Sequence, residues 1–81
     1  MLDGLKSHSK TVGLKQTMRA LEADEVKMVY IAQDADQSLT SKVIDLCNNK
    51  KVEVYNVENM KTLGKNCGID VGTAVAAILK D

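Results

Sequence analysis

The hydrophobic positions of the chain recur with two periods, one typical of strands and one typical of helices. Residues 26–32 form a nearly continuous apolar run, which predicts a strand buried on both faces. Residues 52–57 alternate apolar and polar side chains and predict a second strand. The short length of residues 73–79 and the flanking glycines favour a last buried strand, with small side chains under a helix. A short strand or turn is expected at residues 10–13.

Between these strands, apolar residues recur three or four positions apart, as they do along one side of a helix. A helix from Leu14 to about Ala23 would turn Leu14, Met18 and Leu21 inward, with Thr17 beside them. At the chain start, residues 1–9 could form a further short helix. Its inward residues would be Leu2 and Leu5, and its lone His8 would lie at the surface.

Two further helices each have a recognisable start. Residues 37–49 predict a helix with Asp36 as the expected N-cap and Ser38 as the alternative. The inward residues of this helix would be Leu39, Val43, Leu46 and Cys47. Asn59 can cap the other helix, whose end is marked by Gly68. Its inward residues would be Met60, Leu63 and Cys67.

Strands that alternate with helices predict an α/β fold with helices on both faces of one small sheet. The 81 residues contain no linker and no repeat, so we expect a single domain over residues 1–81. Ligands of such folds collect at loops along one rim of the sheet. The candidates for that rim are the glycine-bearing segments around Gly13 and at residues 64–72.

Composition narrows the possible functions. Eleven basic residues balance eleven acidic ones, so the net charge gives no argument for a nucleic-acid partner. The charge is nevertheless segregated, because residues 1–19 carry Lys6, Lys10, Lys15 and Arg19 against Asp3 alone. The absence of Trp and Phe argues against aromatic stacking platforms for bases.

The cellular compartment is inferred from cysteine usage and hydropathy. The two cysteines fit neither a CxxC motif nor a disulfide framework, so we expect a reducing cytoplasm. Nothing resembles a signal peptide, and the longest apolar run, residues 74–79, is far too short to cross a bilayer.

Enzymatic chemistry finds little support in the sequence. Asp34 and Asp36 could suggest a metal pair, but without a nearby His or Glu, capping is the better interpretation. Cys67 follows Lys65 and could be an activated thiol, although a small packed cysteine is the favoured alternative. No phosphate-binding glycine motif and no nucleophile–base pair is found, so we expect no enzyme, no cofactor and no metal site.

The stretch from Val12 to Arg19 carries the most suggestive chemistry. Gly13 permits a sharp turn and a close backbone approach, and the helix it opens has free N–H groups that suit an anion. Lys15 and Arg19 lie four residues apart on one side of this helix, next to Gln16. This combination suits phosphates and base edges. The alternative is an ordinary amphipathic helix with a solvated basic side.

Three stretches, taken in order, resemble the signatures of a known family: residues 13–19, 29–36 and 63–68. They are similar to the ribosomal protein superfamily named after large-subunit proteins seven-Ae and thirty-e, and most of all to its small bacterial members. The resemblance spans about residues 10–79. It implies a three-layer α/β/α sandwich with a mixed four-stranded sheet. It also implies binding of kink-turn RNA, a helix bent at a three-nucleotide bulge beside tandem sheared G·A pairs.

The resemblance assigns roles to residues at the helix start. The archaeal pattern Gly-x-Asn-Glu followed by Lys corresponds here to Gly13, Lys15, Gln16 and Arg19. Lys15 and Gln16 depart from Asn and Glu, and both match the thirty-e branch and the bacterial members. Lys15 can donate to guanine O6 or N7, and Gln16 can pair with an adenine edge or a guanine acceptor. Arg19 can hold a phosphate or a guanine.

The third signature resembles the loop that covers the extruded bulge nucleotide. Ile69 and Val71 would form its apolar lid, and Lys65 would face phosphate. The RNA-binding residues that the resemblance implies in this segment are Gly64, Lys65, Gly68, Ile69, Asp70 and Val71.

The resemblance therefore implies a cytoplasmic, monomeric RNA-binding protein without a DNA or membrane partner. It leaves open whether the partner is ribosomal RNA, a riboswitch or another transcript, and whether the protein is associated with the ribosome. The rival hypothesis is a protein-interaction module on the same fold, whose basic rim docks an acidic protein partner.

Overall fold

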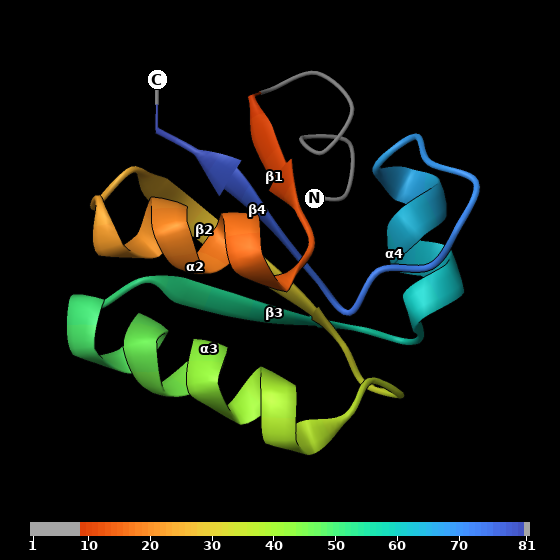
Figure 1. Cartoon of the computed structure of the whole chain (residues 1–81), viewed down its shortest axis with the longest axis horizontal. Coiled ribbons are helices and arrows are strands. Elements are labelled where there is room, and N and C mark those ends of the chain that lie inside the picture. The colour runs from red at the N-terminus through yellow and green to blue at the C-terminus, as the bar shows by residue number, and fades with distance from the viewer. Residues whose placement is uncertain (1–8, 81) are drawn as a thin grey trace.

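The computed structural model describes residues 9–80 of the chain. Within this range it contains four strands and three helices (Figure 1). In chain order they are β1 (Lys10–Val12), α2 (Leu14–Glu22), β2 (Val26–Ala32), α3 (Gln37–Lys50), β3 (Glu53–Val57), α4 (Met60–Asn66) and β4 (Val75–Leu79). Of the helix predicted over residues 1–9, residues 1–8, which include Leu2, Leu5 and His8, lie outside the described residues.

The four strands form one mixed sheet in the order β1-β4-β2-β3. Strands β2 and β3 are parallel, and β4 is antiparallel to both β1 and β2. Strands β1, β2 and β3 therefore end where β4 begins. We call this end of the sheet the rim. Because α2, α3 and α4 each follow one of those strands, all three helices begin at the rim (Figure 1).

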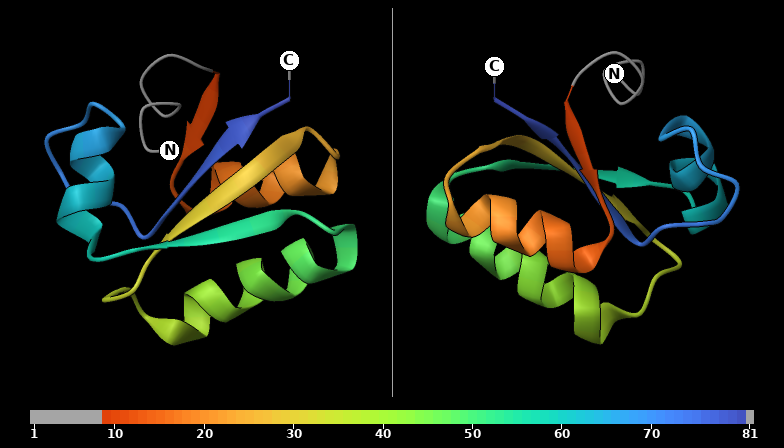
Figure 2. Two further views of the ribbon diagram at one scale, coloured as in Figure 1. Left: turned by 180° about the vertical axis from the view of Figure 1, so that it is seen from behind. Right: turned by 45° about the horizontal axis from the view of Figure 1, so that its top comes forward.

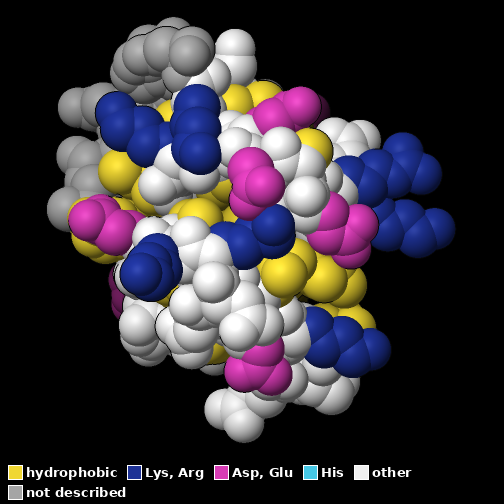
Figure 3. Space-filling model, turned by 90° about the vertical axis from the view of Figure 1, so that its left-hand side faces the viewer, with side chains coloured by type: hydrophobic (Ala, Val, Ile, Leu, Met, Phe, Trp, Pro, Cys, Tyr) yellow, Lys and Arg dark blue, Asp and Glu magenta, His cyan; other side chains and the backbone are white. Residues whose placement is uncertain are grey.

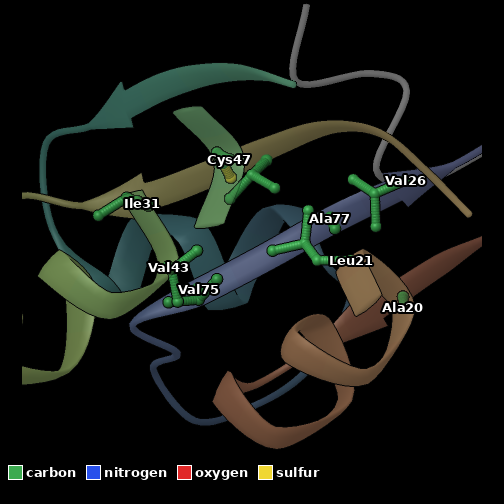
Figure 4. Close-up of a cluster of buried hydrophobic side chains, with 9 residues drawn as sticks. Ala20, Leu21, Val26, Ile31, Val43, Cys47, Val75 and Ala77 are labelled. Atoms are coloured by element: carbon green, nitrogen blue, oxygen red, sulfur yellow. The ribbon is translucent and has the colours of Figure 1, made fainter. Parts of the chain in front are cut away.

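Helices cover both faces of the sheet, as predicted. Helices α2 and α3 lie next to one another on one face, whereas α4 lies apart from them (Figure 2). The core under α2 and α3 contains Leu21, Val43 and Cys47, all of them with no exposed surface (Figure 4). The core under α4 contains Tyr30, Leu63 and Cys67. The predicted three-layer fold is thus confirmed.

Strand periodicity explains how one sheet serves two cores. Successive side chains of a strand point to opposite faces. Val29 and Ile31 of β2 therefore pack under α2 and α3, whereas Tyr30 and Ala32 pack under α4. The β2–β4 register shifts between Val26 and Met28, which marks an irregularity near the start of β2.

The predicted helix starts are confirmed in detail. The Asp36 carboxylate accepts a hydrogen bond from the Ser38 N–H at 2.9 Å and so caps α3. The Asn59 side-chain oxygen accepts one from the Thr62 N–H at 2.7 Å and caps α4. These two bonds satisfy N–H groups that have no partner inside the helix. The Asp36 bonds to Ser38 also hold the pKa of the Asp36 carboxyl below its usual value.

Some predictions about burial were wrong. Leu39 was expected to point inward but is 40% exposed, and Thr40, which is 5% exposed, is buried in its place. Both positions lie about one turn before Val43, so helical spacing allows either to face the sheet. Two boundaries also differ, because β3 begins at Glu53 and β4 at Val75, later than predicted.

Candidate nucleic-acid interface

The start of α2 and the segment that follows α4 are connected through the first residue of β4. The Gly13 N–H, directly before α2, donates to the Val75 carbonyl oxygen at 2.9 Å. The Thr73 hydroxyl donates to the same oxygen, also at 2.9 Å. Thr73 belongs to the segment between α4 and β4, which we call the α4–β4 loop (residues 67–74). One carbonyl group therefore joins the start of α2 to the end of the α4–β4 loop.

The first turn of α2 lacks a side-chain cap. Gly13 is its N-cap, with φ 97° and ψ 162°, a conformation that favours glycine. Helices α3 and α4 are capped by Asp36 and Asn59, so α2 is the one helix within residues 9–80 whose N-cap supplies no acceptor. Its first N–H groups and the positive end of its dipole are thus available to an anion from outside.

Polar residues line the outer side of α2. Lys15, Gln16 and Arg19 are all exposed, and none of their side chains makes a hydrogen bond or ion pair with another residue in the range 9–80. The opposite side of α2 is fixed to the protein. There Thr17 is fully buried, and its hydroxyl lies 2.9 Å from that of Thr11 in β1. The helix thus presents three side chains with unpaired donors, while its other side is packed on the protein.

The α4–β4 loop lies directly on α4. A Cβ atom added to Gly64 would lie 2.1 Å from the Val71 carbonyl oxygen, far closer than any side chain tolerates. A Cβ atom added to Gly72 would lie 3.1 Å from the Met60 Cβ atom. Because Met60 and Gly64 are four residues apart, they lie on the same side of α4. The loop therefore runs along one side of the helix in backbone contact.

The loop residues that the resemblance singled out differ in exposure. Val71 is 70% exposed, and Lys65, Gly68 and Asp70 are exposed as well. Ile69 is only partly exposed, because it packs against the core under α4. Gly68 adopts φ 83°, which turns the chain away from the end of α4. Of the two predicted lid residues, Val71 is the one that projects from the protein.

Comparison with known protein families shows to which family the chain belongs. The family model described as Ribosomal protein L7Ae/L30e/S12e/Gadd45 family matches residues 4–81. The chain belongs to this family. The resemblance inferred from three short signatures is thereby confirmed, together with the fold that it implied.

Relatives of this L7Ae-family chain are similar along most of their length. It is 46% identical over 74 residues to the RNA-binding protein of Bacillus pumilus, covering 91% of this chain and 90% of the relative. It is 43% identical over 76 residues to RNA-binding protein YbxF of Geobacillus stearothermophilus, covering 94% and 93%. The solved Giardia lamblia 15.5kD RNA binding protein superposes with TM-score 0.88 at 25% identity, covering 99% of this chain and 68% of that one.

Cysteines of this L7Ae-family chain are packing residues. Cys67 is 4% exposed, and burial raises the pKa of its thiol, although nearby Lys10 acts in the opposite direction. Burial also raises the pKa of the Cys47 thiol to about 11. Both thiols are therefore uncharged near neutral pH and poor nucleophiles. The favoured interpretation of Cys67 as a small packed residue agrees with this environment.

The two aspartates that suggested a metal pair have separate partners. Asp36 caps α3, as predicted, whereas the Asp34 carboxylate accepts a hydrogen bond from the Met60 N–H at 2.8 Å. That bond connects the β2–α3 turn to the first residue of α4. Within residues 9–80, no group of three or more His, Cys, Asp or Glu side chains could hold a metal ion. The partner of Asp34 lies 26 residues away and gave no signal in the sequence.

Two other surfaces lie outside the predicted interface. A hollow of about 430 Å³ opens between α3 and the ends of β2 and β3, and none of the ten predicted RNA-binding residues lines it. Figure 3 shows the end of the molecule opposite the rim, where basic and acidic side chains are interspersed. Lys50 and Asp24 form an ion pair of 2.8 Å. None of the helices in the described range is long and apolar enough to cross a membrane.

Proposed function

We propose that this member of the L7Ae family binds kink-turn RNA and is not an enzyme. One observation carries the proposal: the first turn of α2 is uncapped, has the unpaired side chains of Lys15, Gln16 and Arg19, and is joined to the end of the α4–β4 loop through the Val75 carbonyl oxygen. The names of the relatives, which describe RNA-binding proteins, support the class of partner. The kink-turn is the finer part of the proposal and follows from the three signatures.

The start of α2 supplies the groups that read and hold the RNA. Lys15 donates to guanine O6 or N7, and Gln16, which can both donate and accept, pairs with a base edge. Arg19 binds phosphate through its guanidinium group. Sheared G·A pairs expose base edges that Watson–Crick pairs would occupy. A kinked RNA therefore offers contacts that a regular A-form helix, with its deep and narrow major groove, withholds.

The α4–β4 loop supplies the contact to the bulge. A nucleotide that leaves the helix exposes an apolar base face, and the exposed Val71 side chain covers it. Lys65 lies on the exposed side of α4 and faces the phosphate. Gly64, Gly68, Ile69 and Asp70 shape the loop around this contact. We treat residues 1–81 as one monomeric binding domain without a cofactor.

Binding to three RNAs tests the proposal. The first is a kink-turn duplex, the second lacks the bulge, and the third has Watson–Crick pairs in place of the G·A pairs. We expect the kink-turn to bind at least roughly tenfold more tightly than either control, since one good bidentate base contact is worth about 1–3 kcal/mol. Equal affinity for all three RNAs in a gel-shift assay would contradict the proposal.

The same assay separates RNA binding from the rival protein-interaction module. Both modes weaken with salt, because both use Lys15 and Arg19, so a salt titration alone does not distinguish them. The dependence of binding on the RNA sequence does distinguish the two modes. A protein that docks an acidic partner would bind all three RNAs weakly and alike, and a poly-glutamate peptide would compete with each of them.

A further inference from the structure

Asp34 accepts a hydrogen bond that bears on the geometry of the proposed RNA site. Its carboxylate lies in the turn between β2 and α3 and accepts the Met60 N–H at 2.8 Å. Met60 is the first residue of α4, and the second side-chain bond to this helix start comes from Asn59. A helix of only seven residues is marginal by itself, so these two bonds fix where α4 begins.

Met60, the residue whose N–H Asp34 accepts, also holds the end of the α4–β4 loop through its carbonyl oxygen. The Thr73 N–H donates to the Met60 carbonyl oxygen at 3.1 Å. Gly72 approaches so closely that an added Cβ atom would lie 3.2 Å from the Met60 carbonyl carbon. The Thr73 hydroxyl then bonds the Val75 oxygen that also receives the Gly13 N–H. A continuous set of contacts thus links Asp34 to the start of α2.

We propose that Asp34 is a positioning residue for RNA binding: by anchoring Met60, it sets the place of the α4–β4 loop relative to the first turn of α2. The inference rests on the proposed function, because the α4–β4 loop and the start of α2 are the two parts of the proposed RNA-binding site. Asp34 itself need not contact RNA. An ionised carboxylate is the suitable group, because a charged acceptor on an N–H at a helix start is stronger than a neutral one.

Three variants separate positioning from charge. Asp34→Ala removes the acceptor, Asp34→Asn keeps a side-chain oxygen, and Glu58→Ala removes an equal charge from an exposed residue just after β3. The Glu58 side chain makes no hydrogen bond or ion pair within residues 9–80, so it is a matched control for charge. Removing a negative charge alone should leave RNA affinity unchanged or slightly increase it.

We expect the loss of the Asp34 carboxylate to change the affinity for kink-turn RNA and for plain duplex RNA differently. Asp34→Ala should weaken kink-turn binding by about tenfold, the size of one lost charged hydrogen bond, while its affinity for plain duplex stays at the native level or rises. Asp34→Asn, which keeps an uncharged acceptor, should recover part of the loss, and Glu58→Ala should show none. If Asp34→Ala behaves like Glu58→Ala, or if Asp34→Asn fails as badly as Asp34→Ala, the inference is overturned.

Amide hydrogen exchange without RNA provides an independent readout. In Asp34→Ala the Met60 and Thr73 amides should exchange at least about tenfold faster, while core amides of β2 and β4 keep their native rates. Unchanged exchange at Met60 and Thr73, or faster exchange throughout the sheet, would overturn the anchoring role. If the native protein showed no preference for the kink-turn, the proposed function would fail, and exchange alone would decide whether Asp34 anchors the loop.

Discussion

Side chains on α2 divide into those that hold the helix and those that are free to bind. Thr17 and Leu21 have no exposed surface, whereas Lys15, Gln16 and Arg19 face solvent. Because the buried side fixes the position of the helix, an exposed residue can be replaced with little effect on folding. Changes in RNA affinity at these positions can then be attributed to lost contacts with RNA.

Gln16 and Arg19 should contribute in different ways. Arg19, at the end of a long stem, is suited to phosphate, which carries no sequence information. We predict that Arg19→Ala weakens kink-turn and plain RNA alike and lowers the salt slope by about one. Gln16, in the first turn, should read a base edge. Gln16→Ala should reduce the preference for sheared G·A pairs by about 1–3 kcal/mol and leave the salt slope nearly unchanged.

Affinity of each variant for two RNAs over a salt series measures both effects. Lys27→Ala is the matched control for charge, since Lys27 is exposed near the start of β2, at the end of the sheet opposite the rim. If Arg19→Ala abolished selectivity while Gln16→Ala changed only the salt slope, the two roles would be reversed. If neither variant differed from Lys27→Ala, α2 would be an ordinary amphipathic helix with a solvated basic side.

At the scale of elements, α4 and the loop after it act as one unit. The loop passes Gly64 so closely that a methyl group there must displace the Val71 carbonyl. At Gly68 the restriction is different: nothing lies within 4 Å of an added Cβ atom, but φ is 83°. Within one short segment, Gly64 is thus required because a side chain would have no space, and Gly68 because of its backbone conformation.

Gly64→Ala is therefore predicted to be the more damaging of two matched substitutions. It should lower the free energy of unfolding by about 3 kcal/mol, because the loop must shift to relieve the overlap. Gly68→Ala should lower it by about 1 kcal/mol through backbone strain alone. Urea unfolding of both variants checks the order. Equal stability, or a kink-turn affinity in Gly64→Ala matching the native protein, would contradict the close contact seen between α4 and its loop.

At the scale of the whole molecule, one rim joins the two proposed recognition segments, which come from opposite faces of the sheet. Helix α2 packs on one face and α4 on the other, and both are connected to the rim through Val75 and Thr73. A surface of fixed shape binds the RNA conformation that matches it. Such a protein shifts a flexible RNA toward that conformation by its differential affinity for the two states.

Protein binding should therefore bend the RNA. With donor and acceptor dyes at the two ends of a kink-turn duplex, adding protein at low magnesium should raise energy transfer until the protein is saturating. The duplex without its bulge serves as the control and should show no rise at the same concentration. Saturated binding without a change in energy transfer would show that the protein does not select the kinked form.

The sequence determined the elements and most of the candidate surface. Helix and strand periods are local properties, so α2, β2 and the start of α3 could be predicted from residues close together in the chain. The exposed character of Lys15, Gln16 and Arg19 followed from the same helical spacing that placed Leu21 inside. The glycine segments indicated the rim, because chain turns there need glycine.

Only the tertiary structure decided how these elements meet. Helical spacing permits either Leu39 or Thr40 to face the sheet, and the packing of α3 selects Thr40. The same holds in the loop, where Ile69 packs inward and Val71 projects. Asp34 and Met60 are 26 residues apart, and their bond forms only because parallel β2 and β3 end side by side. Long-range contacts of this kind depend on strand order, which no local period encodes.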